Sequence, residues 1–545
     1  METKNKGKFW LPLIMAVCIA LGLVIGTILS RNEIYKNGNK FQNLNKISAL
    51  LSLIDAKYVD SLDLSSISEA MIPKVLAELD PHSVYIPADQ RKLMDEQLEG
   101  SFSGIGVQFR ILEDTIYVIA VIKGGPSERA GLIAGDRIVT INDSSFTGKN
   151  INNEKILKTL RGDKRSVVKL GVRRFKNPNI IVHNVIRDDI PVYSIDAKYK
   201  IGNEIGYIKL GTFGINAHSE FIEAYAYLQK QGCSKFIIDL RGNTGGLMEP
   251  ALKIANEFLP NNRLILYTQG KSYPRENIYS DGSGSCQNSP LVVIVDEWSA
   301  SSSEILAGAV QDNDRAWIIG RRSFGKGLVQ TEVPFNDGSA VRLTIARFYI
   351  PSGRSIQKPY LKGQDENYQM DILNRYIKGE FDSKDSIRFI DSLRFETVAG
   401  RSVYGGGGIM PDYFVPLDTS GLSAWYTQVQ NKDLISGFTF GYVDNHRDSL
   451  KLFKSPNHLS SWLDDVNLVP SFVEYAAKKG VRGRSNFISV SFPLVNTHIK
   501  ANIARLMLGE DAFWKMYQEN DKTLNKAVEV VIKSKSKISP GDIPE

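Results

Sequence analysis

Cysteine and histidine are scarce in this chain of 545 residues, which contains three cysteines and six histidines. No Cys or His residues have the short spacing that zinc sites use, so we expect no metal site. Spacing also leaves open whether Cys233 and Cys286 form a disulfide. The histidines are scattered along the chain: His82, His183, His218, His446, His458 and His498.

A strong excess of charge of one sign is absent as well. The chain has 67 Lys and Arg against 60 Asp and Glu, a net charge of +7, which is too dilute to indicate a nucleic-acid partner. The closest group of lysines (Lys533, Lys535 and Lys537) is interpreted as a solvated tail. The hydrophobic fraction of 42% and the charged fraction of 23% are typical of a globular protein, and the length predicts several domains.

One long apolar run is present near the N-terminus, where residues 9–29 contain no charge. At about 1.5 Å per residue, a helix of this length would cross a hydrocarbon core of about 30 Å. Lys4, Lys6 and Lys8 precede the run, and the positive-inside rule keeps them cytoplasmic. Residues 1–30 are therefore predicted to be a membrane anchor. A cleaved signal peptide is the alternative, but no clear A-x-A site follows the run.

The hydrophobic pattern changes several times along the rest of the chain, which predicts a multidomain α+β protein. Residues 41–100 have helical periodicity, residues 101–187 are β-rich, and residues 188–416 alternate strands with helices. Within that third region, residues 360–400 are charged and irregular and are interpreted as an insertion. Residues 420–545 are predicted to be mostly helical.

The alternating region is predicted to be an α/β core. Residues 235–240 and 291–295 are continuously apolar, as strands buried on both faces are. Helices are expected at residues 218–230, 247–259 and 302–312.

A cluster of serines at residues 299–303 lies between a buried strand and an apolar helix. At such a turn the helix N-terminus faces any developing negative charge, but a serine needs a base to become a nucleophile. No histidine occurs from residue 219 to 445, which argues against a Ser-His-Asp triad unless the distant His446 folds back. Taken alone, the cluster is better explained as a helix N-cap.

Lys326 is the alternative base, in a glycine-flanked loop (Ser323–Gly327) that follows the strand expected at residues 317–320. Burial can lower a lysine pKa from about 10.4 by several units, and a neutral amine can take the serine proton. An exposed loop cation is the ordinary interpretation of Lys326 by itself. The serine cluster and this lysine together favour a catalytic pair.

A second glycine-rich loop, Asp239–Gly246, follows a buried strand and opens a helix. Glycines there allow the backbone to approach a ligand, and their N–H groups can form an oxyanion hole. A phosphate loop is disfavoured because neither G-x-G-x-x-G nor the Walker pattern is present. Two S-x-x-K matches, at 355–358 and 534–537, are discounted because Pro359 follows the first and the second lies in the polar tail.

These motifs, in this order, closely resemble those of the C-terminal processing (tail-specific) peptidases, and the resemblance spans about residues 41–416. The matching segments are Leu79–Ser83, Ser103–Val107, Gly125–Asp136, Asp239–Gly246, Ser299–Glu304, Gln311–Asp312, Phe324–Gln330 and Gly407–Asp412.

The resemblance implies a crotonase/ClpP-like protease core that cuts internal peptide bonds through an acyl-enzyme, without metal, nucleotide or other cofactor. Ser301 matches the family's nucleophile, Lys326 its general base and Gln330 the residue that orients the lysine. The backbone N–H groups of Gly246 and Ser302 match the oxyanion donors. The expected location is the bacterial inner membrane, as a single-pass protein whose catalytic part faces the periplasm.

The β-rich residues 101–187 resemble the family's PDZ domain. Such domains add a peptide as an extra strand and hold its terminal carboxylate on backbone N–H groups. Gly104, Ile105, Gly106 and Val107 are the expected carboxylate loop and adjoining strand. The expected partners are therefore protein or peptide substrates bound by their C-terminal tails, while a regulatory or purely structural PDZ module is the alternative.

Two other functions stay open: a non-catalytic tail-binding scaffold and an acyl-CoA enzyme of crotonase-like fold. The insertion and residues 420–545 lie outside the family's common core, where substrate caging, dimerisation, adaptor docking and simple packing are all open. Arg187 and Ile190 mark the junction of the PDZ segment and the core, and a hinge there would couple tail binding to the active site.

Overall fold

The computed structural model describes residues 46–149, 151–175, 177–361 and 365–538. The predicted anchor at residues 9–29 lies outside the described residues. None of the helices within the described ranges is long and apolar enough to cross a membrane. The chain divides into two compact units, Met1–Glu78 and Leu79–Glu545.

The first unit is helical where it is described. Residues 46–57 form one helix, and α2 (Leu64–Ala77) forms the next. Asp63 caps α2, because its carboxylate accepts the N–H groups of Ser65 and Ser66.

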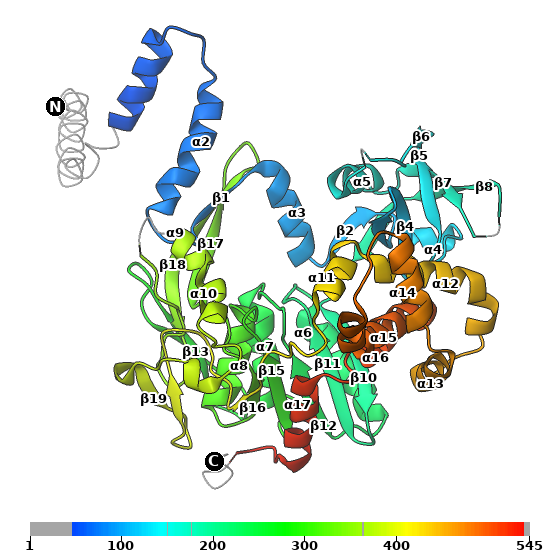
Figure 1. The fold of residues 1–545 in the computed structure, drawn as a ribbon. Helices are drawn as coiled ribbons and strands as arrows, with labels where there is room; N and C mark the ends of the chain where they lie inside the picture. The colour runs from blue at the N-terminus through cyan, green and yellow to red at the C-terminus, as the bar shows by residue number, and fades with distance from the viewer. Residues whose placement is uncertain (1–45, 150, 176, 362–364, 539–545) are drawn as a thin grey trace, which may run out of the picture. The chain divides into compact units, whose positions relative to one another are not determined.

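A six-stranded sheet forms the centre of the second unit (Figure 1), in the order β10-β11-β12-β15-β16-β21. All neighbours from β11 to β21 are parallel, and only β10 runs antiparallel to its partner. The buried strands predicted from continuous apolar runs are β12 and β15. The strands are β10 (Ile195–Ile201), β11 (Ile205–Leu210), β12 (Lys235–Asp239), β15 (Leu291–Val295), β16 (Trp317–Gly320) and β21 (Tyr413–Phe414).

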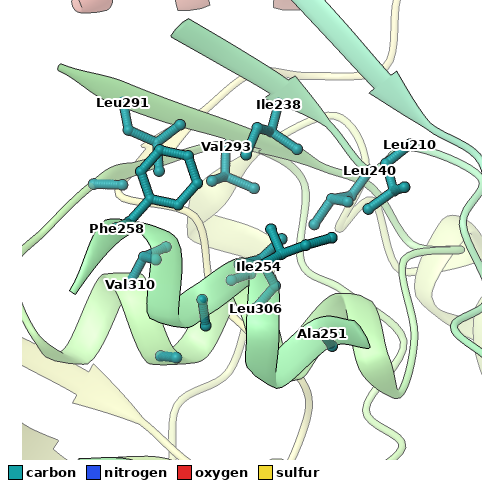
Figure 2. Close-up of a cluster of buried hydrophobic side chains, with 14 of the residues drawn as sticks. Leu210, Ile238, Leu240, Ala251, Ile254, Phe258, Leu291, Val293, Leu306 and Val310 are labelled. Carbon is teal, nitrogen blue, oxygen red and sulfur yellow. The ribbon is translucent and has the colours of Figure 1, made fainter. Parts of the chain in front are cut away.

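Helices cover both faces of this sheet. On one face, α6 (Ala217–Lys230), α7 (Met248–Phe258) and α8 (Ser302–Asp312) share a buried cluster with the strands. Figure 2 shows Phe258 and Val310 from the helices against Val293 of the sheet. On the other face, α17 (Lys522–Lys533) buries its apolar side. Each such buried side chain contributes about 1.5–3 kcal/mol, so α8 and its N-terminus are firmly fixed.

A second sheet has the order β1-β18-β13-β14, with β17 added on β18. The Asn-Asp-Gly sequence at residues 336–338 is typical of a hairpin turn, and β17 and β18 on either side of it pair antiparallel. The sequence predicts a helical region over residues 41–100, yet residues 84–86 form β1, because β18 offers an edge to this Val-Tyr-Ile run. The strands are β1 (Val84–Ile86), β13 (Leu264–Gln269), β14 (Glu276–Tyr279), β17 (Leu328–Pro334) and β18 (Ala340–Tyr349), and helix α3 (Ala88–Leu98) follows β1.

The insertion predicted near residues 360–400 contains short elements beside the second sheet. They are α9 (Asp365–Gln369), α10 (Asp371–Ile377), the 3-10 turns η2 (Lys384–Ser386) and η3 (Asp391–Leu393), and the paired strands β19 (Arg394–Glu396) and β20 (Ser402–Tyr404).

The β-rich segment forms a separate antiparallel sheet in the order β3-β4-β5-β7-β8, with β6 on β5. Its entry and exit are joined, because β2 (Ser101–Gly104) pairs antiparallel with β9 (Asp188–Pro191). The other elements are β3 (Val107–Leu112), β4 (Thr115–Val121), α4 (Pro126–Arg129), β5 (Arg137–Ile141), β6 (Ser144–Ser145), α5 (Asn153–Leu160), β7 (Val167–Arg173) and β8 (Ile180–Ile186).

The region after residue 420 is helical, as predicted, and packs against the β-rich sheet (Figure 1). Leu112 of β3 is buried in the same apolar cluster as the C-terminal helices. Gly480 and Gly509 lie where α14 and α15 end, a position at which glycine is common. The helices are α11 (Ala424–Asn431), α12 (Leu434–Leu450), α13 (Pro456–Val466), α14 (Val469–Lys478), α15 (Ser485–Leu508) and α16 (Glu510–Tyr517).

Candidate active site

Ser301 lies at the N-terminal end of α8, in the turn that follows β15. Its backbone has φ +56° and ψ −112°, a region that residues other than glycine rarely adopt. Such a conformation costs about 1–3 kcal/mol and persists only where the surroundings enforce it. The neighbouring Ser302 contributes to this, because its hydroxyl donates to the carbonyl groups of Gly246 and Leu247.

The fully buried carboxylate of Glu304 connects the serine turn to the lysine loop. Its Oε2 accepts the Ser301 N–H at 2.9 Å and the Lys326 N–H at 2.8 Å. Its Oε1 accepts the Ser323 hydroxyl at 2.5 Å and the Gly325 N–H at 2.7 Å. The backbones of Ser301 and Lys326 therefore meet on one oxygen atom. Burial raises the pKa of Glu304, although all four donors favour its carboxylate form.

The pKa of the Lys326 ammonium is lowered, first by burial and then by the positive charge of Arg342. Glu304 and Asp80 act in the opposite direction, but the net shift is downward. The site therefore favours the neutral amine more than water does, as a proton-accepting lysine requires.

Gln330, the predicted orienting residue, lies on β17 close to the lysine loop. Its amide Nε2 donates to the carbonyl oxygen of His82 at 2.5 Å. The His82 ring is 2.7 Å from the Tyr368 hydroxyl, and burial together with the charge of Lys326 lowers the pKa of His82 to about 4. His82 is therefore neutral at neutral pH.

The roles of Glu304 and His82 do not follow from the sequence patterns described above. A signal for Glu304 existed, because a glutamate three residues after an N-terminal serine is the capping-box pattern. His82 lies in one of the recurring motifs, Leu79–Ser83, but its distance of 248 residues from Gln330 left the contact invisible.

Gly245 faces the serine directly. An added Cβ would lie 2.9 Å from the Ser301 Cβ and 2.9 Å from the Ala300 carbonyl oxygen, and its φ of +105° also favours glycine. Gly246 approaches the backbone of Phe213 so closely that a Cβ would lie 2.4 Å from its carbonyl oxygen. The loop thus brings the backbone of residues 245–246 against the serine turn.

Two amide groups of this region are free. Within the described part of the chain, neither the Gly246 N–H nor the Ser302 N–H donates a hydrogen bond. Asn243 keeps the loop in shape, because its side chain donates to the Leu210 carbonyl at 2.8 Å and accepts the Gly245 N–H at 2.8 Å. Free N–H groups beside a nucleophile are what oxyanion stabilisation requires.

Behind this loop lies a buried ion pair between Asp239 and Arg241, with 2.6 Å between the atoms. Burial alone would raise the pKa of Asp239, but Arg241 and Lys209 lower it. Arg241 also contacts Asp521 at 2.6 Å, so the N-terminal cap of α17 supports the loop from the C-terminal region.

The predicted carboxylate loop lies between β2 and β3. Gly106 has φ +74°, and its carbonyl oxygen accepts the Ile122 N–H at 3.0 Å. Ile105 is buried, and its carbonyl oxygen accepts the Ser127 N–H at 3.0 Å. Val107 begins β3, the first strand in its sheet order, which leaves one side of β3 as an edge. Gly104, in contrast, ends β2 and pairs with Asp188.

The junction residues are ordered by local contacts. Arg187 donates to the carbonyl oxygens of Leu160 and Thr159, at 3.0 and 2.9 Å, and so caps the end of α5. Ile190 lies opposite Phe102 in the β2–β9 pair. Cys233 and Cys286 are both free and buried. Among the described residues, no three His, Cys, Asp or Glu side chains form a group that could hold a metal ion.

Comparison with known proteins agrees with this architecture. Residues 204–366 match peptidase family S41, residues 103–181 match a PDZ domain, and residues 425–509 match a family of unknown function. The carboxy-terminal processing protease CtpA of Bacillus subtilis is 34% identical over 361 residues, 65% of this chain and 76% of that protein. The carboxy-terminal-processing protease of Bartonella bacilliformis is 33% identical over 324 residues, 58% of this chain and 74% of that protein.

Among solved structures, the photosystem II D1 C-terminal processing protease is 28% identical, with 57% of this chain and 84% of that chain covered and a TM-score of 0.32. The family matches define a serine-type protease that carries a PDZ domain. The chain belongs to peptidase family S41, among the carboxy-terminal processing proteases.

Proposed function

We propose that the protein is an endopeptidase that cleaves by a Ser-Lys dyad of Ser301 and Lys326. The observation that supports this most directly is the Glu304 carboxylate, which accepts backbone N–H groups from both residues on one oxygen. The lowered pKa of Lys326 supports its role as general base.

In the proposed reaction, the neutral Nζ of Lys326 takes the proton of the Ser301 hydroxyl as Oγ attacks the substrate carbonyl carbon. The oxyanion that forms accepts the free N–H groups of Gly246 and Ser302. When the C–N bond breaks, Lys326 returns the proton to the leaving amine. Water then hydrolyses the acyl-enzyme, with the same lysine as base. Gln330 acts indirectly in this scheme, because it fixes His82 beside the lysine.

We propose further that the PDZ domain selects substrates by their C-terminal tails. A tail would add to the free edge of β3, with its carboxylate on the loop from Gly104 to Val107.

The domains would follow the sequence boundaries 41–100, 101–187, 188–416 and 420–545. Residues 9–29 would anchor the chain in the bacterial inner membrane with the protease in the periplasm; release of the protein from membranes by alkaline carbonate would argue against this.

The decisive experiment compares wild type with Ser301→Ala and Lys326→Ala, and uses Lys271→Ala as a control at an exposed lysine. A loosely folded test protein with an apolar or a charged C-terminal tail is incubated with each, and cleavage is followed by mass spectrometry. We expect both dyad variants to lose activity by roughly 10⁴-fold or more and the control to keep it.

The same assay tests the alternatives. Cleavage by Ser301→Ala at the wild-type rate would reject the dyad. Tail binding without cleavage by wild type would favour the scaffold, and turnover of acyl-CoA would favour the crotonase-like enzyme. Equal rates for tailed and untailed substrates would reject selection by the PDZ domain.

A further inference from the structure

The insertion after β18 contacts the loop that carries Lys326. Arg375 of α10 donates from Nη1 to the carbonyl oxygen of Ser323 at 3.0 Å and from Nη2 to that of Arg322 at 2.7 Å. Only 3% of Arg375 is exposed, so these bonds form away from water. A planar guanidinium can serve two adjacent carbonyl groups at once, which a lysine ammonium does less well.

An aromatic contact also holds the Lys326 loop against the insertion. The ring of Tyr368 in α9 packs edge-on against Phe324, with 6.1 Å between the ring centres. The Nζ of Lys358 lies 4.0 Å from the centre of each ring and 3.1 Å from the carboxylate of Asp371 in α10. A cation placed over aromatic rings is attracted by their electron-rich faces. The insertion therefore holds the side chain of Phe324, the residue that follows Ser323.

A carboxylate balances the buried charge of Arg375. Glu380 lies 3.3 Å from Arg375 Nε and 2.6 Å from Arg322 Nη2. Glu380 therefore connects the insertion to the side chain of Arg322, and Arg375 also binds the carbonyl oxygen of this residue. A buried arginine requires such a partner, since an unpaired buried charge is strongly destabilising.

The two sides of the lysine loop are thus held by different parts of the chain. Glu304 accepts the N–H groups of Gly325 and Lys326 from the α8 side. Arg375 binds the preceding carbonyl groups from the insertion. Among the residues that the structure describes, Arg375 forms hydrogen bonds with neither Ser301 nor the side chain of Lys326, so it acts on the base only through the backbone.

We propose that Arg375 is a positioning residue for the general base, and that residues 365–380 form a brace that holds the Lys326 loop in its working geometry. The proposal rests on the assignment of Lys326 as base in the proposed function. In this proposal the insertion supports the protease site directly, in addition to the substrate caging or adaptor docking that the sequence leaves open.

The first test measures the loop itself. Hydrogen–deuterium exchange of a peptide that contains residues 322–327 is compared between the full-length wild type, Arg375→Ala and Arg375→Lys, with exposed Arg388→Ala as the control in the same insertion. We expect loss of protection in Arg375→Ala, less loss in Arg375→Lys and none in the control. Unchanged protection in both Arg375 variants would overturn the brace, whether or not the protein cleaves peptides.

The second test measures the chemistry. For the same variants, kcat, KM and the pH profile of kcat/KM are determined with the tailed test protein. A displaced base should lower kcat by up to about 100-fold with little change in KM, move the rising limb of the profile, and be partly rescued by lysine. A fall in thermal stability with unchanged kcat and pH profile would make Arg375 merely structural.

The two tests separate the proposals. If Ser301→Ala cleaves like wild type while Arg375→Ala still loses protection, the dyad fails and the brace on the loop stands. If Arg375→Ala does not fold, Arg375→Lys carries both comparisons.

Discussion

At the scale of single residues, the pKa of Lys326 is shifted by charges that lie far from it in the sequence. Arg342 on β18 lowers the pKa of Lys326, while Glu304 and Asp80 raise it. Arg342 is itself paired with Glu332 at 3.0 Å, so its charge is held in place. The balance sets the pH at which the amine becomes able to accept a proton.

We predict that Arg342→Gln raises the pKa of Lys326, because removal of a nearby positive charge favours the ammonium form. In the proposed mechanism Lys326 accepts a proton only when it is neutral, so the rising limb of the pH profile of kcat/KM should move to higher pH. Each unit of that move lowers activity below the limb about tenfold.

Arg347→Gln is the matched control, since Arg347 is an exposed arginine on the same strand and is not among the charges that shift Lys326. Identical pH profiles for the Arg342 variant and wild type would mean that Lys326 is not the group that titrates.

At the scale of elements, the serine turn and the glycine loop fit together only if certain positions lack a side chain. Gly245 has φ +105° and faces the Ser301 Cβ, whereas Gly242 has φ +74° and no atom within 4 Å of where its Cβ would be. Alanine at Gly242 would therefore show the cost of the backbone conformation alone, whereas alanine at Gly245 would add the cost of a steric clash.

We predict that Gly242→Ala costs about 1–2 kcal/mol of stability, the cost of a left-handed alanine, and leaves most activity. Gly245→Ala should cost about 1–3 kcal/mol more, because the added methyl displaces the serine turn, and should lower kcat by about 100-fold or more. Thermal unfolding and steady-state kinetics check both values. Equal kcat for the two variants would show that the approach of Gly245 to Ser301 is unimportant for catalysis.

At the scale of the whole second unit, the C-terminal helices contact both the PDZ domain and the protease core. Asp444 of α12 pairs with Arg137 of β5 at 2.5 Å, and its side chain is only 2% exposed. Asp521 contacts Arg241 behind the glycine-rich loop Asp239–Gly246. The helical region, part of which matches a family of unknown function, thus holds the PDZ domain from the sheet face that β3, β4 and β5 present.

We predict that Asp444→Asn weakens this contact by about 1.5–3 kcal/mol, the contribution of a charge-assisted hydrogen bond, because Arg137 is left partly buried without its partner charge. Thermal unfolding of the full chain and the rate of limited proteolysis between the PDZ domain and the helices report the change.

Asp448→Asn, four residues further on the same helix, is the control, because that carboxylate is 96% exposed. Its variant should behave like wild type. If both variants unfold at the same temperature, the buried pair contributes nothing to the packing of the two domains.

The sequence by itself determined the features that short-range physics controls. Continuous apolar runs identified β12 and β15, the helical spacing identified α8 to the residue, and ordered motifs identified the family together with Ser301 and Lys326 as candidates. Each strand, helix and single motif depends on residues a few positions apart, so its pattern is visible in one dimension.

Only the tertiary structure decided the contacts that surround those candidates. Glu304 accepts a hydrogen bond from the lysine loop, about 22 residues away, and Gln330 donates one to His82. Strand β1 pairs with β18, and Arg375 of the insertion donates to the lysine loop. Buried polar groups must find partners wherever the packed chain brings them, and that choice depends on the whole fold. Local patterns therefore identified the candidate catalytic residues, and long-range packing determined their surroundings.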